Sequence, residues 1–409
     1  MKWPLISLKQ ICNTQYGYTA SADDFNVGPK YLRITDIASG PIDWESVPYC
    51  KISESDYPKY RLNAGDIVIA RTGNTTGYAK LIREDNNAIF ASYLVRIKIK
   101  SDLSYSGYIG RLVESDIYKN FVKSIKGGAA QGNANATTLT LFKFRLPPIE
   151  IQKTIASILS TYDDLFDNNR KRIQLLEESA RLLFREWFVY FRFPFDSAQG
   201  RPGHEKVHPI RKSNSNGVKI VGDVPEGWKK RRLVEVADIA MGQSPKSVYY
   251  NDNGFGLPFH QGVTGFGDRF PTNQIYCTQK NRMAQAGDIL FSVRAPVGRI
   301  NISTEKIIIG RGLSAIRSKE NHQSYLFYEL KNHFFKEDMI GGGAIFAAIT
   351  KKDLENVVII YPDERTIEQF EKITNPIDRQ INILSIQNQK LAQARDLLLP
   401  RLMSGAIEV

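Results

Sequence analysis

Short runs of apolar residues, separated by turn-forming residues, characterise the first part of each half of the chain. In the first half these runs are DIVIAR (66–71), LVRIKIK (94–100) and KFRLP (143–147). In the second half they are DILFSV (288–293), KIIIG (306–310) and VVIIYP (357–362). Gly, Asn, Asp and Pro lie between them, which is the pattern of strands joined by turns. Each half is therefore expected to begin with a β-rich domain.

A different period begins at Ile151 and predicts helices. Apolar or aromatic residues recur at spacings of four and three, with one interruption, at Ile151, Ile155, Ile158, Tyr162, Leu165, Ile173, Leu176, Ala180, Leu183 and Trp187. The second half repeats the pattern at Phe370, Ile373, Ile377, Ile381, Leu384, Leu391 and Leu398. This spacing is typical of helices that bury a narrow apolar seam, as in a coiled coil.

An asparagine stands in each seam where an apolar residue is due, at Asn169 and Asn388. Two interpretations stay open. A buried polar residue at such a position lowers stability but can fix register and partner. Alternatively, both asparagines are exposed where the seams drift.

Capping signals predict that each helical stretch is broken. STYDD (160–164) has the form of an N-cap followed by acidic residues, and in TNPID (374–378) Asn375 is expected to cap a helix that begins at Pro376. We therefore expect, in each half, a short helix followed by a helix of about 28 residues, which would span about 42 Å.

The two halves are related by an internal repeat. GDIVIARTGNTTG (65–77) matches GDILFSVRAPVG (287–298), with Asp66 and Asp288 lying 222 residues apart. Further matches in the same order are Trp3 with Trp228, Pro148 with Pro362, and ARLL at 180 with ARDLLL at 394. Such a period is too long for a solenoid and indicates two similar domains. We predict an α+β fold in which two similar globular domains are separated by a pair of long antiparallel coiled-coil helices, with a pseudo-twofold internal repeat.

Composition narrows the class of protein. Of 409 residues, 42% are hydrophobic and 24% are charged, and the formal net charge is +12. No membrane-spanning run or signal-peptide pattern occurs, and the three cysteines form no CxxC pair, so we expect a cytoplasmic protein without disulfides or a zinc site. The basic balance favours an anionic partner, most often nucleic acid.

No catalytic constellation is found in the sequence. There is no GxxxxGK[ST] loop and no GxGxxG between a strand and a helix, and the histidines form no HxH or HExxH pattern. The glycine-rich stretch GFGLPFHQGVTGFG (254–267) is interpreted as a structural or DNA-facing loop. We therefore expect a non-enzymatic chain with no catalytic residue and no metal ligand.

Polar loop residues are the candidates for DNA contact. In the first half they are Arg71, Thr72, Asn74, Thr75, Gln131 and Asn133, and in the second half Gln243, Lys246, Arg294 and Arg299. Arginine and asparagine match guanine and adenine edges bidentately, whereas lysine more often meets phosphate. For each residue the alternative is a solvated loop side chain. A helical spacer of about 42 Å suits two reading domains, because one DNA turn separates sites by about 34–36 Å.

In combination these features resemble the DNA-specificity subunits of type I restriction–modification systems. The resemblance extends over nearly the whole chain. It is carried by GDIVIARTG, GDILFSVRAPVG, LPPIEIQKTIASIL (146–159), LLEESARLLFREWF (175–188), VPEGWKKRRLVEVA (224–237) and LLLPRLMSGAIEV (397–409). TIEQFEKITNPID (366–378) departs from the PLPPLxEQ-like start that the family usually has in its second helical region.

The resemblance implies a division of the chain into five parts. These are target-recognition domain 1 (1–147), helical conserved region 1 (148–191), a linker (192–216), target-recognition domain 2 (217–361) and helical conserved region 2 (362–409). Each recognition domain would read one half of a split double-stranded DNA sequence. The helical regions would hold the domains apart and dock two modification subunits. The residues that would form the coiled-coil helix pair or meet a partner are Leu165, Asn169, Ile173, Leu176, Ile381, Leu384, Asn388 and Leu391.

The resemblance further implies that this chain binds no cofactor. S-adenosylmethionine, ATP and Mg²⁺ would belong to the modification (methyltransferase) subunits and the restriction (translocase-nuclease) subunits. Three other classes stay open: a self-sufficient nuclease or transferase, a protein-binding scaffold that never meets nucleic acid, and the specificity chain of a related system whose partner both cuts and methylates.

Overall fold

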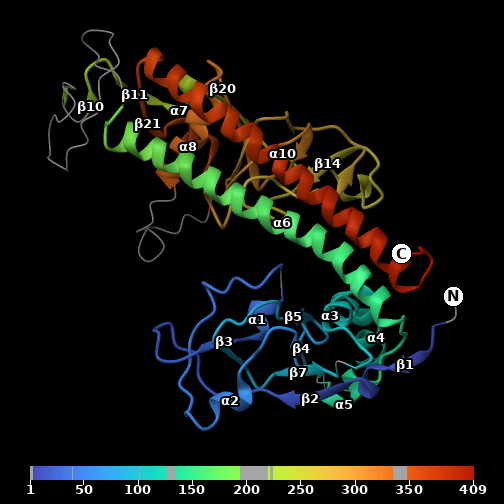
Figure 1. The fold of residues 1–409 in the computed structure, drawn as a ribbon. Helices are drawn as coiled ribbons and strands as arrows, with labels where there is room; N and C mark the ends of the chain where they lie inside the picture. Colours follow the sequence, from blue (N-terminus) through green and yellow to red (C-terminus); the bar gives the residue numbers. More distant parts are fainter. Residues whose placement is uncertain are drawn as a thin grey trace. The chain divides into compact units, whose positions relative to one another are not determined.

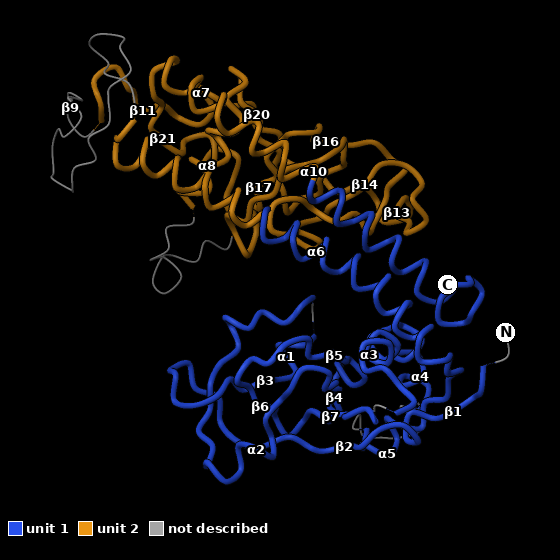
Figure 2. The backbone as a smooth tube through the Cα atoms, in the orientation of Figure 1, with its two compact units in different colours: residues 1–172, 384–409 blue, residues 173–383 orange. Residues whose placement is uncertain are grey.

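The chain folds into two compact units that share two long helices. The computed structural model describes residues 3–38, 40–100, 102–126, 134–193, 220–221, 224–334 and 348–409. Unit 1 comprises residues 1–172 and 384–409, and unit 2 comprises residues 173–383 (Figure 2). Helices α6 (Ile149–Phe184) and α10 (Glu364–Met403) each contribute to both units (Figure 1). Unit 1 therefore contains both the beginning and the end of the chain.

A four-stranded antiparallel sheet forms the centre of unit 1. Its strand order is β2 (Cys12–Tyr16), β7 (Leu94–Ile99), β4 (Ile67–Ala70), β5 (Ala79–Leu81). Two further pairs are the parallel β3 (Lys30–Leu32) and β6 (Ala88–Phe90), and the antiparallel β1 (Leu5–Ser7) and β8 (Lys143–Arg145). The helices are α1 (Ile34–Ile37), α2 (Tyr57–Tyr60), α3 (Ser106–Glu114), α4 (Asp116–Lys126) and α5 (Ala136–Leu139), with a 3-10 turn at Leu8–Gln10.

Unit 2 repeats this topology. Its four-stranded sheet has the order β12 (Ala237–Met241), β20 (Leu313–Ser318), β17 (Ile289–Ser292), β18 (Ile300–Ile302). The parallel pair is β14 (Leu257–His260) with β19 (Ile307–Ile309), and this sheet is extended by β13 (Tyr250–Asn251), β15 (Tyr276–Cys277) and β16 (Met283–Ala284).

The remaining elements of unit 2 surround these sheets. β11 (Lys229–Arg232) pairs with β21 (Val358–Tyr361), and β9 (Ile220–Val221) pairs with β10 (Val224–Pro225). The helices are α7 (Leu233–Val236), α8 (Gln323–Phe334) and α9 (Lys351–Glu355), with a 3-10 turn at Ser247–Tyr249. The matching strand orders confirm the internal repeat predicted from the sequence.

The strand predicted from DIVIAR is apolar at every position because it separates two cores. Ile67 and Ile69 enter one hydrophobic cluster, and Val68 and Ala70 enter another. A strand that is buried on both faces has a continuous apolar run instead of an alternating one. β17 is the equivalent strand of unit 2, and it likewise sends alternate side chains into two clusters.

The repeated Gly–Asp pair before these strands has a structural role. Gly65 and Gly287 have positive φ angles of 90° and 87°, a region that favours glycine. The Asp66 carboxylate accepts a hydrogen bond from the Asn63 backbone N–H (3.0 Å) and contacts Arg96 (3.3 Å). Asp288 makes the same turn and pairs with Arg317 (2.6 Å). Each half thus closes this turn around a buried aspartate.

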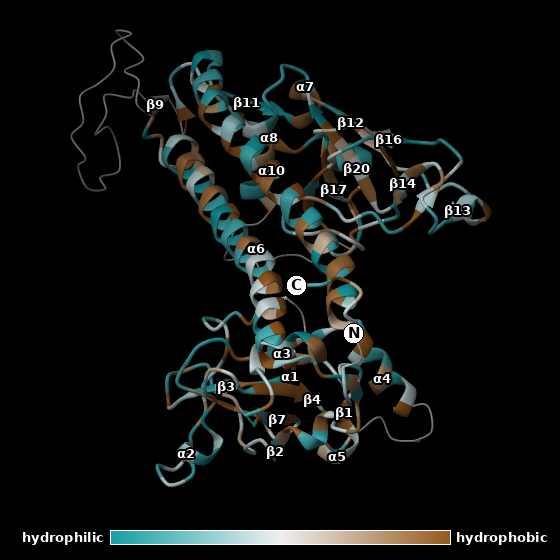
Figure 3. Cartoon of the chain, turned by 45° about the vertical axis from the view of Figure 1, so that its right-hand side comes forward, coloured by the Kyte–Doolittle hydropathy of each residue, from teal (hydrophilic) through white to brown (hydrophobic). Residues whose placement is uncertain are grey.

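Helices α6 and α10 run antiparallel where they meet within each unit. In unit 1, Asp163 contacts Arg395 (3.0 Å), while Asn169, further along α6, contacts Asn388, which lies earlier on α10. In unit 2 the Phe184 and Phe370 rings lie 6.1 Å apart. Both apolar and polar bands follow α6 along its length (Figure 3). The antiparallel direction agrees with the prediction, whereas the supercoiling of a coiled coil stays a prediction.

The two seam asparagines are buried and contact each other. Each is 7% exposed, and Asn169 Nδ2 donates a hydrogen bond to Asn388 Oδ1 (3.0 Å). The interpretation that both asparagines are buried in the seam is therefore confirmed, and the alternative that they are exposed is wrong. Since the two amides lie on different helices, their hydrogen bond ties one register of α6 to one register of α10.

Two of the predicted seam positions are wrong. Leu165 is 47% exposed and Ile373 is 44% exposed. Asp163 occupies the inward position of α6 instead, and Leu165, two residues later, is rotated by about 200° away from it. On α10 the inward position is likewise taken by a polar residue, since Thr374 is buried and the preceding Ile373 is turned outward.

The predicted helix breaks are also wrong, because α6 and α10 are continuous over 36 and 40 residues. Ser160 and Thr161 lie inside α6, and the Thr161 hydroxyl donates to the Ser157 carbonyl (3.1 Å) rather than capping a new helix. Pro376 lies inside α10 at an exposed position. The backbone carbonyl that loses its partner to proline can there be hydrated, and packing of the buried face maintains the helix. After α6 the chain makes a π-helical turn at Arg185–Val189.

In unit 1 a buried carboxylate joins the β-rich domain to both helices. Asp163 on α6 contacts Arg83 from the loop after β5 (3.0 Å), Arg111 from α3 and Arg395 from α10 (3.0 Å). Asp164 and Asp167 also contact Arg83, at 3.4 and 3.7 Å. The acidic residues of STYDD thus serve as counter-ions for arginines, not as a helix cap.

In unit 2 a buried arginine has the corresponding role. Arg269, 3% exposed, lies in the loop between β14 and β15 and contacts Glu177 of α6 (2.8 Å) and Asp378 of α10 (2.5 Å). Burial alone would lower the pKa of Arg269, but Tyr328, Asp378 and Glu177 outweigh it and raise the pKa above the ordinary value. The guanidinium therefore stays charged. In both units, arginines of the β-rich domain form ion pairs with carboxylates of the long helices.

We expect Asp163→Ala to destabilise unit 1 by about 3 kcal/mol or more, because it removes the nearest carboxylate from the buried Arg111 and leaves Glu114, at 3.7 Å, as its one carboxylate contact among the described residues. Asp164→Ala is the matched control: its side chain is 73% exposed, so a loss within about 1 kcal/mol is expected. Denaturant-induced unfolding of the purified chain measures both. Equal losses for the two variants would contradict this role of Asp163.

A second buried carboxylate makes unit 2 sensitive to pH. Glu371 of α10 accepts a hydrogen bond from the Tyr325 backbone N–H (2.8 Å), while its Oε2 atom is buried without a partner among the described residues. Burial, with repulsion from Asp378, raises the pKa of Glu371 to about 7. The folded state thus holds this proton more tightly than the unfolded chain.

The stabilisation from protonated Glu371 is fully present below pH 4.5 and is lost as pH rises towards about 7. We therefore expect Glu371→Gln to raise the melting temperature at pH 8, by an amount equivalent to at most about 3 kcal/mol, and to change it little at pH 5. Thermal unfolding at both pH values measures the effect, with Glu368→Gln as an exposed control. A gain at pH 5 as large as that at pH 8 would contradict the assignment.

Candidate nucleic-acid interface

Two glycines at equivalent strand ends bring separate segments together. Gly17 follows β2 and Gly242 follows β12, and their backbone N–H groups donate to the carbonyls of Leu94 (3.3 Å) and Leu313 (2.9 Å). A Cβ atom on Gly17 would overlap the Ala91 carbonyl, and one on Gly242 would overlap the Gly310 carbonyl. Only glycine permits this approach of two backbones.

The strand pairings and backbone hydrogen bonds around these glycines show which residues of unit 1 and unit 2 occupy equivalent positions. Leu32 pairs with Phe90 in unit 1, and His260 pairs with Ile309 in unit 2. After the central strands, the Arg71 carbonyl accepts from the Ala134 N–H (2.8 Å), and the Val293 carbonyl accepts from the Ile349 N–H (2.9 Å). We call the resulting set the strand-end face: Tyr16, Tyr18, Arg33, Arg71 and Ser92 in unit 1, and, in the same order, Met241, Gln243, Gln261, Val293 and Arg311 in unit 2.

In unit 1 the strand-end face holds Arg71 in a defined position. Its guanidinium carbon lies 4.8 Å from the centre of the Tyr16 ring, and Nη1 donates to the Ser92 carbonyl (3.4 Å). The Tyr16 hydroxyl accepts a hydrogen bond from the Ala136 backbone N–H (3.1 Å). The ring is therefore fixed at both ends, and a cation–π contact fixes the guanidinium on it.

In unit 2 the strand-end face carries different side chains on the same backbone. The Ser244 hydroxyl donates to Gln261 Oε1 (2.7 Å) and accepts from the Arg311 backbone N–H (3.2 Å). Gln261 and Arg311 are exposed. His260 of the glycine-rich stretch is buried and bonded to Asn273 (2.9 Å), which agrees with a structural role for that histidine.

The other candidate residues lie in the neighbouring loops. Thr72 and Thr75 are half-buried and Asn74 is exposed in the turn that ends at Gly77, while Gln243, Lys246, Arg294 and Arg299 are exposed in unit 2. Gln131 and Asn133 lie outside the described residues. Sequence reasoning missed Tyr16, Gln261 and Arg311. Gly242 follows the mainly apolar run ADIAM, but Gly17 follows the mixed run CNTQY, so no sequence pattern singled these residues out.

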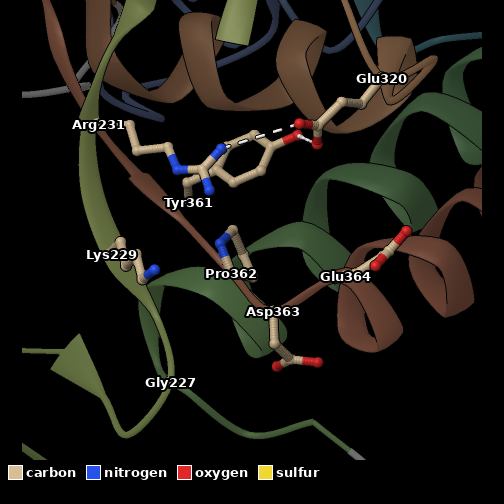
Figure 4. Close-up of a pocket in the computed structure, with 8 residues that line it drawn as sticks. All are labelled: Gly227, Lys229, Arg231, Glu320, Tyr361, Pro362, Asp363 and Glu364. Carbon is tan, nitrogen blue, oxygen red and sulfur yellow. Dashed lines mark hydrogen bonds and ion pairs between the residues drawn. The ribbon is translucent and has the colours of Figure 1, made fainter. Parts of the chain in front are cut away.

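A cavity of about 250 Å³ in unit 2 does not offer a ligand site. Arg231 lies over the Tyr361 ring (4.8 Å) and points towards Glu320, to which the Tyr361 hydroxyl donates (2.8 Å; Figure 4). Asp363 accepts hydrogen bonds from the Thr366 backbone N–H (3.0 Å) and from Trp228 Nε1 (3.0 Å). Arg231, Tyr361, Glu320 and Asp363 are thus engaged with neighbouring groups of the protein, and the contact of Trp228 with Asp363 joins the start of β11 to the start of α10.

Two absences hold for the part of the chain that the structure describes. None of its helices is both long and apolar enough to cross a membrane. Within the same residues, His, Cys, Asp and Glu side chains nowhere gather in a group of three or more that could hold a metal ion.

The comparison with protein families decides the identity. A model of the type I restriction modification DNA specificity domain matches residues 1–178 and again residues 225–393. The chain belongs to this family. The two matches cover most of both halves, so the family's domain occurs twice in this specificity subunit, in agreement with the repeated topology.

Individual relatives support this membership along the whole chain. A Methanocaldococcus jannaschii protein named as the MjaX type I specificity subunit is 32% identical over 420 residues, covering 100% of this chain and 94% of its own. The HindI specificity subunit of Haemophilus influenzae is 23% identical over 450 residues, covering 94% and 96%. The crystal structure of a type I S subunit from M. genitalium has a TM-score of 0.59 at 14% identity, covers 98% of this chain and 96% of its own, and shows the same fold.

We expect Gly242→Ala to disrupt the strand-end face of this specificity subunit, because the new methyl group would meet the Gly310 carbonyl. A melting temperature several degrees lower, together with weaker DNA binding, is the expected result. Gly262→Ala is the control, since its added Cβ would have open space. Thermal unfolding and DNA-binding titrations measure both, and unchanged behaviour of the Gly242 variant would contradict the close approach.

Proposed function

We propose that this specificity subunit reads a split double-stranded DNA sequence, one half-site with each unit, and docks two modification subunits and the restriction subunits. The chain itself would supply recognition but no catalytic group. S-adenosylmethionine, ATP and Mg²⁺ would act in the partner subunits. The observation that carries the proposal is the pair of strand-end faces, which share one backbone arrangement but carry different side chains.

Base contacts are proposed for the loops around these faces. Arg71, Thr72, Asn74 and Thr75 of unit 1 and Gln243, Arg294 and Arg299 of unit 2 can reach base edges or phosphates, and Lys246 is proposed for phosphate. The net charge of +12 supports an anionic partner. Different side chains on one scaffold are what two unlike half-sites require.

Docking of the modification subunits is proposed for the long helices. Large apolar side chains are exposed there: Leu165 and Leu397 in unit 1, and Leu175, Leu182 and Ile383 in unit 2, at 46–72% exposure. Leu165, which is not part of the inner seam, fits this role. Exposed apolar side chains on charged helices indicate a surface that another chain covers.

Modified-base sequencing of genomic DNA from cells with and without this gene tests the proposal. N6-methyladenine is expected to disappear from one split motif when the gene is removed and to return on complementation. In vitro, the affinity of the complex for that motif should fall steeply with salt, by about 10³-fold or more between 50 and 200 mM if six or more phosphates are contacted. Methylation that is unchanged without the gene would overturn the proposal, and salt-independent binding would favour a protein-binding scaffold.

A further inference from the structure

The two strand-end faces share a feature that their sequences hide. In unit 1, the Arg71 guanidinium extends from the loop after β4 to the backbone carbonyl of Ser92 (3.4 Å). In unit 2 the position equivalent to Arg71 is Val293, which has no charge. However, the position equivalent to Ser92 is Arg311. One backbone position is thus linked to an arginine in both units: in unit 1 the guanidinium of Arg71 reaches it, and in unit 2 the exposed Arg311 side chain starts from it.

We propose that Arg71 in unit 1 and Arg311 in unit 2 each read a guanine, at equivalent places in the two half-sites, and that Tyr16 positions Arg71. This inference rests on the proposed function and names the residues that would carry it. Guanine is the base indicated because its N7 and O6 atoms accept two hydrogen bonds from one guanidinium.

The geometry of Arg71 fits base reading better than phosphate binding. One face of its guanidinium lies on the Tyr16 ring at 4.8 Å, and one N–H is held by the Ser92 carbonyl. Of its five N–H donors, one on Nη1 is held by Ser92 and the one on Nε is buried, which leaves the two on Nη2 and the second on Nη1 for a ligand. A side chain fixed in this way loses little conformational entropy on binding and presents its donors in one direction, which favours a planar, bidentate acceptor.

Tyr16 is a positioning residue whose ring, not its hydroxyl, contacts Arg71. Tyr16 is 43% exposed, and its hydroxyl accepts a hydrogen bond from the Ala136 backbone N–H (3.1 Å). In unit 2 the equivalent residue is Met241, which offers no aromatic face. Met241 needs none, since Arg311 begins at the strand-end face and its backbone N–H is fixed by the Ser244 hydroxyl (3.2 Å).

The test uses the full chain produced with its modification subunits in cells that lack other adenine methylation. Modified-base sequencing defines the motif for the wild type and for Arg71→Ala and Arg311→Ala. With Arg71→Ala, one guanine of one half-site should become degenerate while the other half-site stays strict. Arg311→Ala should relax one guanine of the other half-site. Affinity for the original site should fall about tenfold to a hundredfold in each case.

Matched controls separate base reading from loss of charge or of fold. Arg61→Ala and Arg282→Ala remove exposed arginines outside the strand-end face and should leave the motif unchanged. The half-site that stays strict shows that the variant complex is folded and active. Tyr16→Leu should relax the same guanine as Arg71→Ala, and Tyr16→Phe, which keeps the ring, should restore strict reading.

Several outcomes would overturn the inference. Equal weakening at all DNA sequences would mean that the arginine contacts phosphate, and relaxation of the same half-site by both variants would contradict the equivalence of the two places. An unchanged motif would exclude both arginines from reading. If wild-type chain supports no methylation, the proposed function itself fails, whereas a wild-type motif that neither variant alters defeats only this inference.

Discussion

The rest of the structure depends on a few charges that are buried where the β-rich domains meet the helices. Asp163 has counter-ions on a loop, on α3 and on α10, and Arg269 has them on α6 and α10. A buried charge that loses its partner costs several kcal/mol, so each domain has one arrangement on its part of the helices in which all these groups are paired. Within each unit, that arrangement also determines where the strand-end face lies relative to the helix surface.

The repeated phrase, which looks at first like a functional motif, instead supplies the frame for recognition. Its glycine and buried aspartate close a turn, its apolar run forms the strand between two cores, and its final glycine ends the next loop. The aspartates pair with arginines that stand at different register positions, since Val68 lies opposite Arg96 whereas Arg317 lies two residues further along the equivalent strand. Both units therefore keep a buried aspartate paired with an arginine, although the arginine stands at a different position of the strand in each unit.

The sequence was sufficient to predict the strands, the duplication and the family, because each rests on local pattern or on the order of landmarks. It was not sufficient for features decided by tertiary contacts. STYDD satisfies the local rules of an N-cap. However, Asp163 forms ion pairs with Arg83, Arg111 and Arg395, which lie 80, 52 and 232 residues away in the chain. Pro376 satisfies the rules of a helix start, but the packed face of α10 maintains the helix through it. For the candidate site, loop arginines were found by residue type, whereas Tyr16 and Arg311 became visible only through strand register.

The contacts of Gly17 and Gly242 have an evolutionary consequence. Each joins one stretch of backbone to another, with no side chain from the strand-end face taking part in the close approach. Side chains that take no part in the close approach can therefore differ between the two units, as Ser92 and the exposed Arg311 do at equivalent positions. A chain built in this way can vary the side chains of its strand-end faces without changing the backbone approach that holds the strand ends together.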